Sequence, residues 1–213
     1  MTTRSAIRVL LISAVAFTLY VALGVTTGAQ APLAVGSARV TINGTSNIHA
    51  YTASTTTVNV TRAQFAAAAG PEFWASVLKP GAVEDFEVAI PAATLTSPRD
   101  GLDKVMHKAL MVKEHRDITF RLLRFEPRPG MADALRAVGV LKVGGVEREV
   151  ALDITTERKG SAMSVQGQTQ FLMTDFGIKP PTAMLGMLKT DPKVSVAFEV
   201  VLESGSRPTT TIH

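Results

Sequence analysis

The chain has 213 residues, of which 46% are hydrophobic, 19% are charged and none is cysteine, which excludes a disulfide framework, a thiol nucleophile and a thiolate metal site. The formal net charge of +4 comes from scattered basic residues, with Arg121, Arg124 and Arg128 as the densest group. Nucleic-acid binders are expected to cluster basic residues beside stacking aromatics, so we expect no nucleic-acid partner.

The N-terminal segment has the order of an export signal. Arg4 and Arg8 precede an apolar run at residues 9–25, and small residues follow it. We therefore predict a signal peptide at residues 1–29 and a periplasmic or secreted protein. The alternative is an uncleaved N-terminal anchor that faces outside the cytoplasm, because the run is only a little shorter than the roughly 20 residues of a membrane-spanning helix.

Residues 30–203 are predicted to form one domain built from β-strands. Apolar and polar residues alternate along residues 86–90, 118–122, 146–154 and 194–202, which is typical of strands with one buried face. Such alternation favours an antiparallel sheet, because parallel strands are buried on both faces. Gly144-Gly145 separates two of these strands and predicts a two-residue hairpin.

Two stretches break the strand pattern. Residues 62–78 are expected to hold two short helical pieces, interrupted at Gly70-Pro71, with Phe73, Trp74 and Val77 in the second. Residues 100–112 (DGLDKVMHKALMV) carry apolar residues at helical spacing, acids in the first turn and lysines towards the end, which predicts an amphipathic helix. Residues 204–213 are expected to form a flexible tail.

About eight strands and one main helix in this length favour a closed antiparallel barrel, since closure removes the unpaired edges of a sheet. A barrel of about eight strands is either filled by its side chains or holds one small ligand. The strand pattern by itself leaves both options open.

The order of motifs resembles the YceI-like lipid/polyisoprenoid-binding family. The matching segments are residues 40–51 (VTINGTSNIHAY), 103–110 (DKVMHKAL) with the following Ile118-Thr119-Phe120, 139–146 (GVLKVGGV) and 174–178 (TDFGI). Each motif alone has little specificity, whereas all of them in this order behind a signal peptide are specific. The first segment has Tyr51 where the family usually has tryptophan.

The resemblance implies a lipocalin-like closed antiparallel barrel with an elongated apolar cavity for an isoprenoid quinone or a polyprenyl lipid. The lipid would be bound as a ligand, and no cofactor is expected. The residues expected to contact it lie on the inward strand faces, on the predicted helix and in the segments that follow the strands. They are Phe86, Val88, Ile90, Met106, Leu110, Ile118, Phe120, Leu122, Phe171, Met173, Phe176, Met184, Leu185, Met187 and Phe198.

The segment 182–188 (TAMLGML) follows Pro180-Pro181 and is more apolar than a solvated loop should be. It is interpreted either as a flap over the mouth of the cavity or as a short helix packed on an ordinary core.

Catalytic and metal sites are not expected. No G-x-S-x-G motif surrounds a serine, although Ser46, His49, Asp103 and His107 supply the residue types of a triad. The histidines lack the spacing that would place two metal ligands on one face.

Three functional hypotheses follow. The first is an exported, non-enzymatic carrier or buffer of an isoprenoid-type lipid, with membrane contact limited to an uncleaved leader or to transient lipid exchange. The second is a filled barrel that acts as an envelope interaction or stress-associated module. A hydrolase is the third. The oligomeric state stays open, with a homodimer as one option.

Overall fold

The computed structural model describes residues 33–66, 72–128, 134–183 and 187–204. The predicted signal peptide and most of the predicted tail lie outside these residues, as do Met184 and Leu185 of the segment 182–188. Within the described residues no helix has the length and apolar character needed to cross a membrane.

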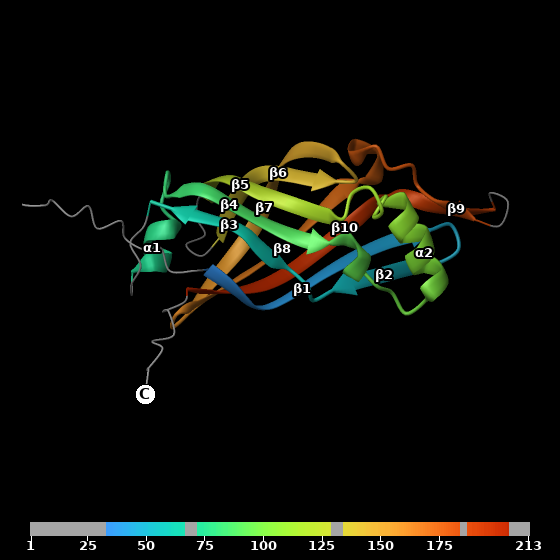
Figure 1. Ribbon diagram of the computed structural model, residues 1–213. Coiled ribbons are helices and arrows are strands. Elements are labelled where there is room, and N and C mark those ends of the chain that lie inside the picture. Colours follow the sequence, from blue (N-terminus) through green and yellow to red (C-terminus); the bar gives the residue numbers. More distant parts are fainter. Residues whose placement is uncertain (1–32, 67–71, 129–133, 184–186, 205–213) are drawn as a thin grey trace, which may run out of the picture.

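The fold is a single, strongly curled antiparallel sheet with a helix at each end (Figure 1). Its strands follow the order β2-β1-β10-β8-β7-β6-β5-β4-β3, and the short β9 pairs with the beginning of β10. The strands are β1 (Leu33–Ser46), β2 (Ala50–Thr55), β3 (Asn59–Phe65), β4 (Val83–Pro91), β5 (Asp117–Pro127), β6 (Ala134–Val143), β7 (Val146–Lys159), β8 (Ala162–Leu172), β9 (Thr182–Ala183) and β10 (Leu188–Ser204).

The prediction of an antiparallel, mostly β fold is confirmed, but the ladder of hydrogen bonds does not close into a full barrel among the described residues. Its two ends are β2 and β3, which follow each other in the chain. The free edge of β2 instead pairs with Thr96, through one hydrogen bond in each direction between Ser54 and Thr96 of 2.8 and 3.0 Å. These bonds occupy backbone groups that a closing strand would need.

Two of the predicted helices are observed, and one predicted helical piece is not. Helix α2 (Asp100–Ala109) and helix α1 (Phe73–Val77) form where helices were expected. The first helical piece predicted within residues 62–78 is wrong, because residues 62–65 belong to β3. There the Arg62 guanidinium spans the strand pair and contacts the carboxylates of Asp85 and Glu87, a cross-strand arrangement that local helix propensity does not anticipate.

The predicted hairpin between β6 and β7 is confirmed. Gly144 and Gly145 have φ angles of 55° and 83°, which is the left-handed geometry of a tight two-residue turn. Two 3-10 turns complete the described elements, η1 (Ala92–Thr94) after β4 and η2 (Met173–Phe176) after β8.

Side chains fill the interior of the curled sheet at the α1 end. Phe73 and Trp74 of α1 insert between the strands, and the two rings meet edge to face at 5.0 Å. Phe65 packs against Phe73 at 5.8 Å, and the Trp74 indole N–H donates to the Ser161 carbonyl at 2.8 Å. All of these rings are nearly inaccessible, so this end of the sheet is a closed core.

Glycines provide space for aromatic rings further along the sheet. Gly167 lies directly opposite Phe198 in the β8–β10 ladder, and a Cβ at Gly167 would lie 2.6 Å from the Phe198 ring and 2.7 Å from the Asp153 carbonyl oxygen. The ring therefore rests against bare backbone, which allows an aromatic side chain to lie along the sheet.

Replacing Gly167 by alanine is expected to lower the free energy of unfolding by about 1–3 kcal/mol, because the new methyl group overlaps a ring and a backbone carbonyl that cannot both retreat. Urea-induced unfolding measures the change. The control is Gly101→Ala in α2, where an added Cβ has no neighbour within 4 Å. That variant should be neutral or more stable by up to about 1 kcal/mol, owing to the helix propensity of alanine. Equal stability of Gly167→Ala and the parent would contradict the assigned contact.

Candidate functional site

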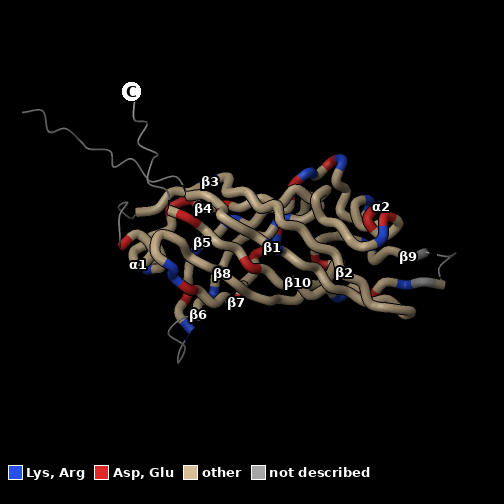
Figure 2. Tube along the Cα trace, turned by 90° about the horizontal axis from the view of Figure 1, so that it is seen from below, with Lys and Arg blue, Asp and Glu red and all other residues tan. Residues whose placement is uncertain are grey.

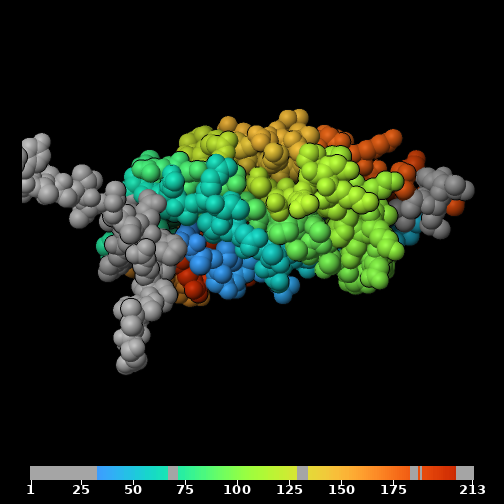
Figure 3. All heavy atoms as spheres, viewed as in Figure 1, coloured from blue at the N-terminus to red at the C-terminus, as the bar shows by residue number. Residues whose placement is uncertain are grey.

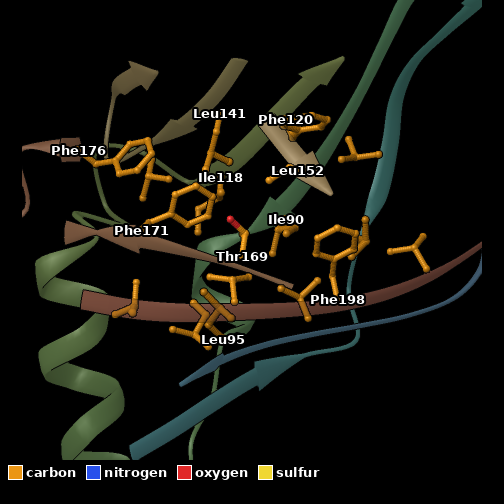
Figure 4. Close-up of a pocket in the computed structure, with 18 of the residues that line it drawn as sticks. Ile90, Leu95, Ile118, Phe120, Leu141, Leu152, Thr169, Phe171, Phe176 and Phe198 are labelled. Atoms are coloured by element: carbon orange, nitrogen blue, oxygen red, sulfur yellow. The ribbon is translucent and has the colours of Figure 1, made fainter. Parts of the chain in front are cut away.

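The curled sheet encloses a cavity of about 600 Å³ that reaches from the α1 core, where Phe65, Trp74 and Met163 line it, towards α2. Its walls are the inward faces of the strands, and α2 contributes to the wall at the far end (Figure 4). The side chains of Ile118 and Phe120 of β5, Phe171 of β8 and Phe198 of β10 point towards the same space. Protein interiors contain few voids larger than a water molecule, so a space of this size is a candidate binding site.

The lining is almost entirely apolar because alternate residues of each strand face the same side. In β4 and β5, for example, Val88 pairs with Phe120 and Ile90 pairs with Ile118, and all four line the cavity. These side chains are only half-buried, since protein atoms do not fill the space in front of them. The arrangement suits a ligand that offers apolar surface and few polar groups.

The cavity brings together most of the residues that the sequence assigned to lipid contact. Met187 does not line it and is instead 66% exposed, and Met184 and Leu185 lie outside the described residues. The assigned residues that line the cavity are Phe86, Val88, Ile90, Met106, Leu110, Ile118, Phe120, Leu122, Phe171, Met173, Phe176 and Phe198. Their contact with a lipid stays a prediction.

Sequence reasoning missed part of the wall. Leu95, between η1 and α2, is buried beneath the cavity, and no periodic pattern marks it. Val40 and Ile42 of β1 also line the cavity and could have been found from their alternation. The polar residues of the wall were missed too: His49 and Arg99 lie between elements, where no strand alternation marks them, and Thr169 lies on β8.

Several residues both line the cavity and are exposed, and they lie at the α2 end. They include His49 in the turn after β1, Arg99 before α2, Val105 of α2 and Leu172 at the end of β8. The cavity therefore opens at the α2 end, opposite the closed α1 end.

Polar groups converge at this mouth. The Arg99 guanidinium donates to the His49 imidazole Nε2 at 3.0 Å, which places the imidazole proton on Nδ1. The Ser46 hydroxyl donates to the His49 carbonyl at 2.9 Å and so braces the turn that carries His49. A hydrogen-bonding headgroup would meet these groups while its tail lay among apolar side chains.

Tyr51 lies across the backbone near the mouth. Its ring covers Gly44, the residue opposite it in the β1–β2 ladder, where any Cβ would clash with the phenol. Burial raises the pKa of the Tyr51 phenol, and the negative charge of Asp191 raises it further. The phenol is thus held neutral and able to donate a hydrogen bond over the whole physiological range.

The residues considered for catalysis have other partners. The His107 imidazole contacts the Leu95 carbonyl through Nε2 at 2.8 Å, and the Asp103 carboxylate accepts from the Ser97 amide at 2.8 Å. These contacts fasten α2 to the segment before it. Within the described residues no three His, Asp or Glu side chains are grouped as metal ligands would be.

Comparison with known families gives one match that spans most of the chain. The family described as YceI-like domain matches residues 34–202. Among curated proteins none matches the chain significantly.

Solved structures with the same fold have little sequence in common with the chain. Burkholderia cenocepacia BcnA superposes with a TM-score of 0.60 at 13% identity, covering 77% of this chain and 95% of its own. A polyisoprenoid binding domain from Saccharophagus degradans, implicated in plant cell wall breakdown, has a TM-score of 0.58 at 12% identity and covers 83% and 99%. The Campylobacter jejuni YCEI protein has a TM-score of 0.50 at 14% identity and covers 70% and 85%. At such identities the likeness is one of fold.

Tyr51 is expected to lose its proton above the ordinary tyrosine pKa of about 10. Because the pKa is raised on folding, the stability contributed by the neutral phenol is fully present below pH 10 and is lost as the pH rises through the raised pKa. The chain has two tyrosines, so the absorbance titration of Tyr51→Phe is subtracted from that of the parent.

Replacing Asp191 by asparagine should lower the Tyr51 pKa only part of the way, since burial is the larger cause. A Tyr51 transition at or below pH 10 in the parent protein would contradict the buried position of the phenol.

Proposed function

Since the chain belongs to the YceI-like domain family, we propose that it is an exported, non-enzymatic carrier that holds a long isoprenoid-type lipid, such as a quinone or polyprenyl lipid, in its apolar cavity. The lipid tail lies along the inside of the curled sheet, and the headgroup stays near the mouth at the α2 end. The cavity that side chains leave unfilled is the observation that carries this proposal.

The energetics favour a ligand of this kind. Burial of apolar surface contributes about 0.8 kcal/mol per methylene group, so each five-carbon isoprenoid unit is worth roughly 4 kcal/mol before the costs of association. A few units suffice for tight binding, even after the several kcal/mol that the loss of translational and rotational freedom costs on association. No strong polar contact with the tail is needed, which agrees with the apolar lining.

Methionines add adaptability to the wall. Met106 of α2 and Met173 of η2 line the cavity near its mouth. The unbranched thioether changes shape at little cost, which suits a tail with many conformers. The polyisoprenoid binding domain from Saccharophagus degradans, whose fold this chain shares, lends further support.

The rival hypothesis is a filled barrel that acts as an interaction module. It predicts an interior packed like the α1 end throughout. The cavity of about 600 Å³ argues against it, since this volume falls within the range of small-molecule sites, roughly 300–1,000 Å³.

The proposal predicts that the protein carries lipid when it is purified. Native mass spectrometry and organic extraction of freshly prepared protein should detect an isoprenoid-type lipid in about equimolar amount. Protein stripped of lipid should bind an added long-chain quinone. Absence of any extracted lipid, together with no binding of the quinone, would overturn the carrier in favour of the filled barrel.

Filling part of the cavity should weaken binding without unfolding the protein. Thr169 is half-buried on the cavity wall, so phenylalanine at this position would project into space that the tail needs (Figure 4). Displacing two methylene groups from apolar contact weakens binding at least about tenfold. Quinone titration measures the loss.

The matched control is Thr169→Val, which keeps the shape of the side chain and removes only its hydroxyl. It should bind the quinone as the parent does. Equal binding by Thr169→Phe and Thr169→Val would show that the ligand does not occupy this cavity.

A further inference from the structure

Most of the large hydrophobic side chains that the described residues leave exposed lie at the end of the molecule that holds the cavity mouth. Leu123, in the middle of β5, is the exception. We call the others the apolar rim, and they are Ile48 at 59% exposure, Val105 at 40%, Met111 at 38%, Leu172 at 40% and Met187 at 66%. They come from separate segments: the β1–β2 turn, α2 and the turn after it, the end of β8, and the residue before β10.

Hydrogen bonds hold parts of this rim together. The Asn47 side chain donates to the Met187 carbonyl at 2.8 Å and accepts from the Lys189 amide at 2.8 Å. Ile48 and Met187, the two most exposed members, therefore belong to segments that are fastened to each other. Figure 3 shows the surface of α2 and that of the chain around η2 and β9 at the same end. Exposed apolar side chains gathered in this way mark a contact surface.

The turn after α2 supports this view. The helix ends in a Schellman arrangement in which the Val112 amide bonds to the His107 carbonyl and the Met111 amide bonds to the Lys108 carbonyl, both at 3.1 Å. In this arrangement the first residue after the helix cap has a left-handed backbone. Met111 occupies that position, with φ of 53°. Glycine is the usual residue there, so the exposed methionine is kept at a conformational cost.

Exposed lysines surround the rim. Lys104 and Lys108 lie on α2, Lys113 follows it, Lys179 follows η2 and Lys189 begins β10. Within the described residues none of these lysines has a carboxylate close enough for an ion pair. Their charges are available to an external partner.

The described segments around α2, η2 and the start of β10 carry a net positive charge. Residues 92–116, 173–183 and 187–191 contain seven basic and five acidic residues. The other described residues contain twelve of each and are neutral overall. Both signs of charge are visible on α2 in Figure 2, but two of the acids at this end, Asp103 and Asp191, accept from backbone amides.

We infer that the α2 end docks on the surface of an anionic lipid bilayer, with the apolar rim in the interface and the surrounding lysines on the lipid headgroups. An apolar face bordered by lysines is the pattern of interfacial membrane binding, to which each basic residue adds electrostatic attraction. Because the mouth lies within the docked surface, a lipid tail passes between bilayer and cavity without crossing water. This inference rests on the proposed carrier function.

The test is binding to vesicles by flotation, with phosphatidylcholine alone or mixed with phosphatidylglycerol. The parent protein should bind the mixed vesicles more tightly than pure phosphatidylcholine. Its binding should fall as the salt concentration rises, because the Debye screening length decreases to a few ångströms near 1 M salt. The double variant Ile48→Ser with Met187→Ser should reduce binding to the mixed vesicles by about tenfold. All variants share one N-terminus, so any contribution of the leader cancels.

Leu123→Ser is the matched control, because it removes one exposed leucine away from the mouth. It should bind vesicles as the parent does. Lys104→Gln, Lys113→Gln and Lys179→Gln combined should weaken binding to the mixed vesicles by roughly a hundredfold and change binding to pure phosphatidylcholine little. Lys79→Gln, near α1, should have no effect.

Quinone binding in detergent separates this inference from the proposed function. The rim and lysine variants should retain it, because their side chains lie outside the cavity or on its outer margin. The docking surface is wrong if the parent ignores both kinds of vesicle, or if Leu123→Ser loses as much binding as the rim variant. Sedimentation provides a further check: a homodimer that the rim variant abolishes would assign the surface to a second copy of the chain and overturn the membrane assignment.

Discussion

The molecule depends on an apolar interior that its own side chains close at the α1 end and leave unfilled along the rest of the sheet. Along every long strand, alternate residues face inward and are shielded from water, which is the main favourable term of folding. At the α1 end Phe65, Phe73 and Trp74 complete the packing. Further along the sheet the inward side chains enclose a cavity of about 600 Å³. A void of this size weakens the fold, so the closed core at the other end has to provide the stability that a carrier needs.

This difference between the ends also separates their roles. The α1 end is held by ring packing and by the Trp74 hydrogen bond. The α2 end is built from turns and a helix, and it carries the polar mouth, the unpaired lysines and the apolar rim. The proposed carrier function requires such a division, because the part that exchanges a ligand has to be accessible to it, whereas the core that stabilises the fold has to exclude water.

Sequence reasoning succeeded where local pattern and tertiary environment agree. Helix α2 and the Gly144-Gly145 hairpin follow from spacing and turn chemistry alone. It failed at residues 62–65, where a helical piece was expected and the chain instead pairs with β4, with Arg62 contacting Asp85 and Glu87 across the strand pair. Closure was also overestimated, because the bonds between Ser54 and Thr96 occupy the edge of β2. Both errors concern partners distant in sequence.

By itself the sequence determined the class of fold, the positions of most strands, and which side chains face inward, because a period of two assigns each residue to one face of a sheet. It could not decide whether those side chains meet or leave a space, since that depends on how strongly the sheet curls and on which rings rest against Gly139 and Gly167. The tertiary structure alone decided that the interior is open at the α2 end. It also decided that Ile48, Met187 and the surrounding lysines, from segments far apart in the chain, lie at the same mouth, because loops at one end of a curled sheet are brought together by the strands that they connect.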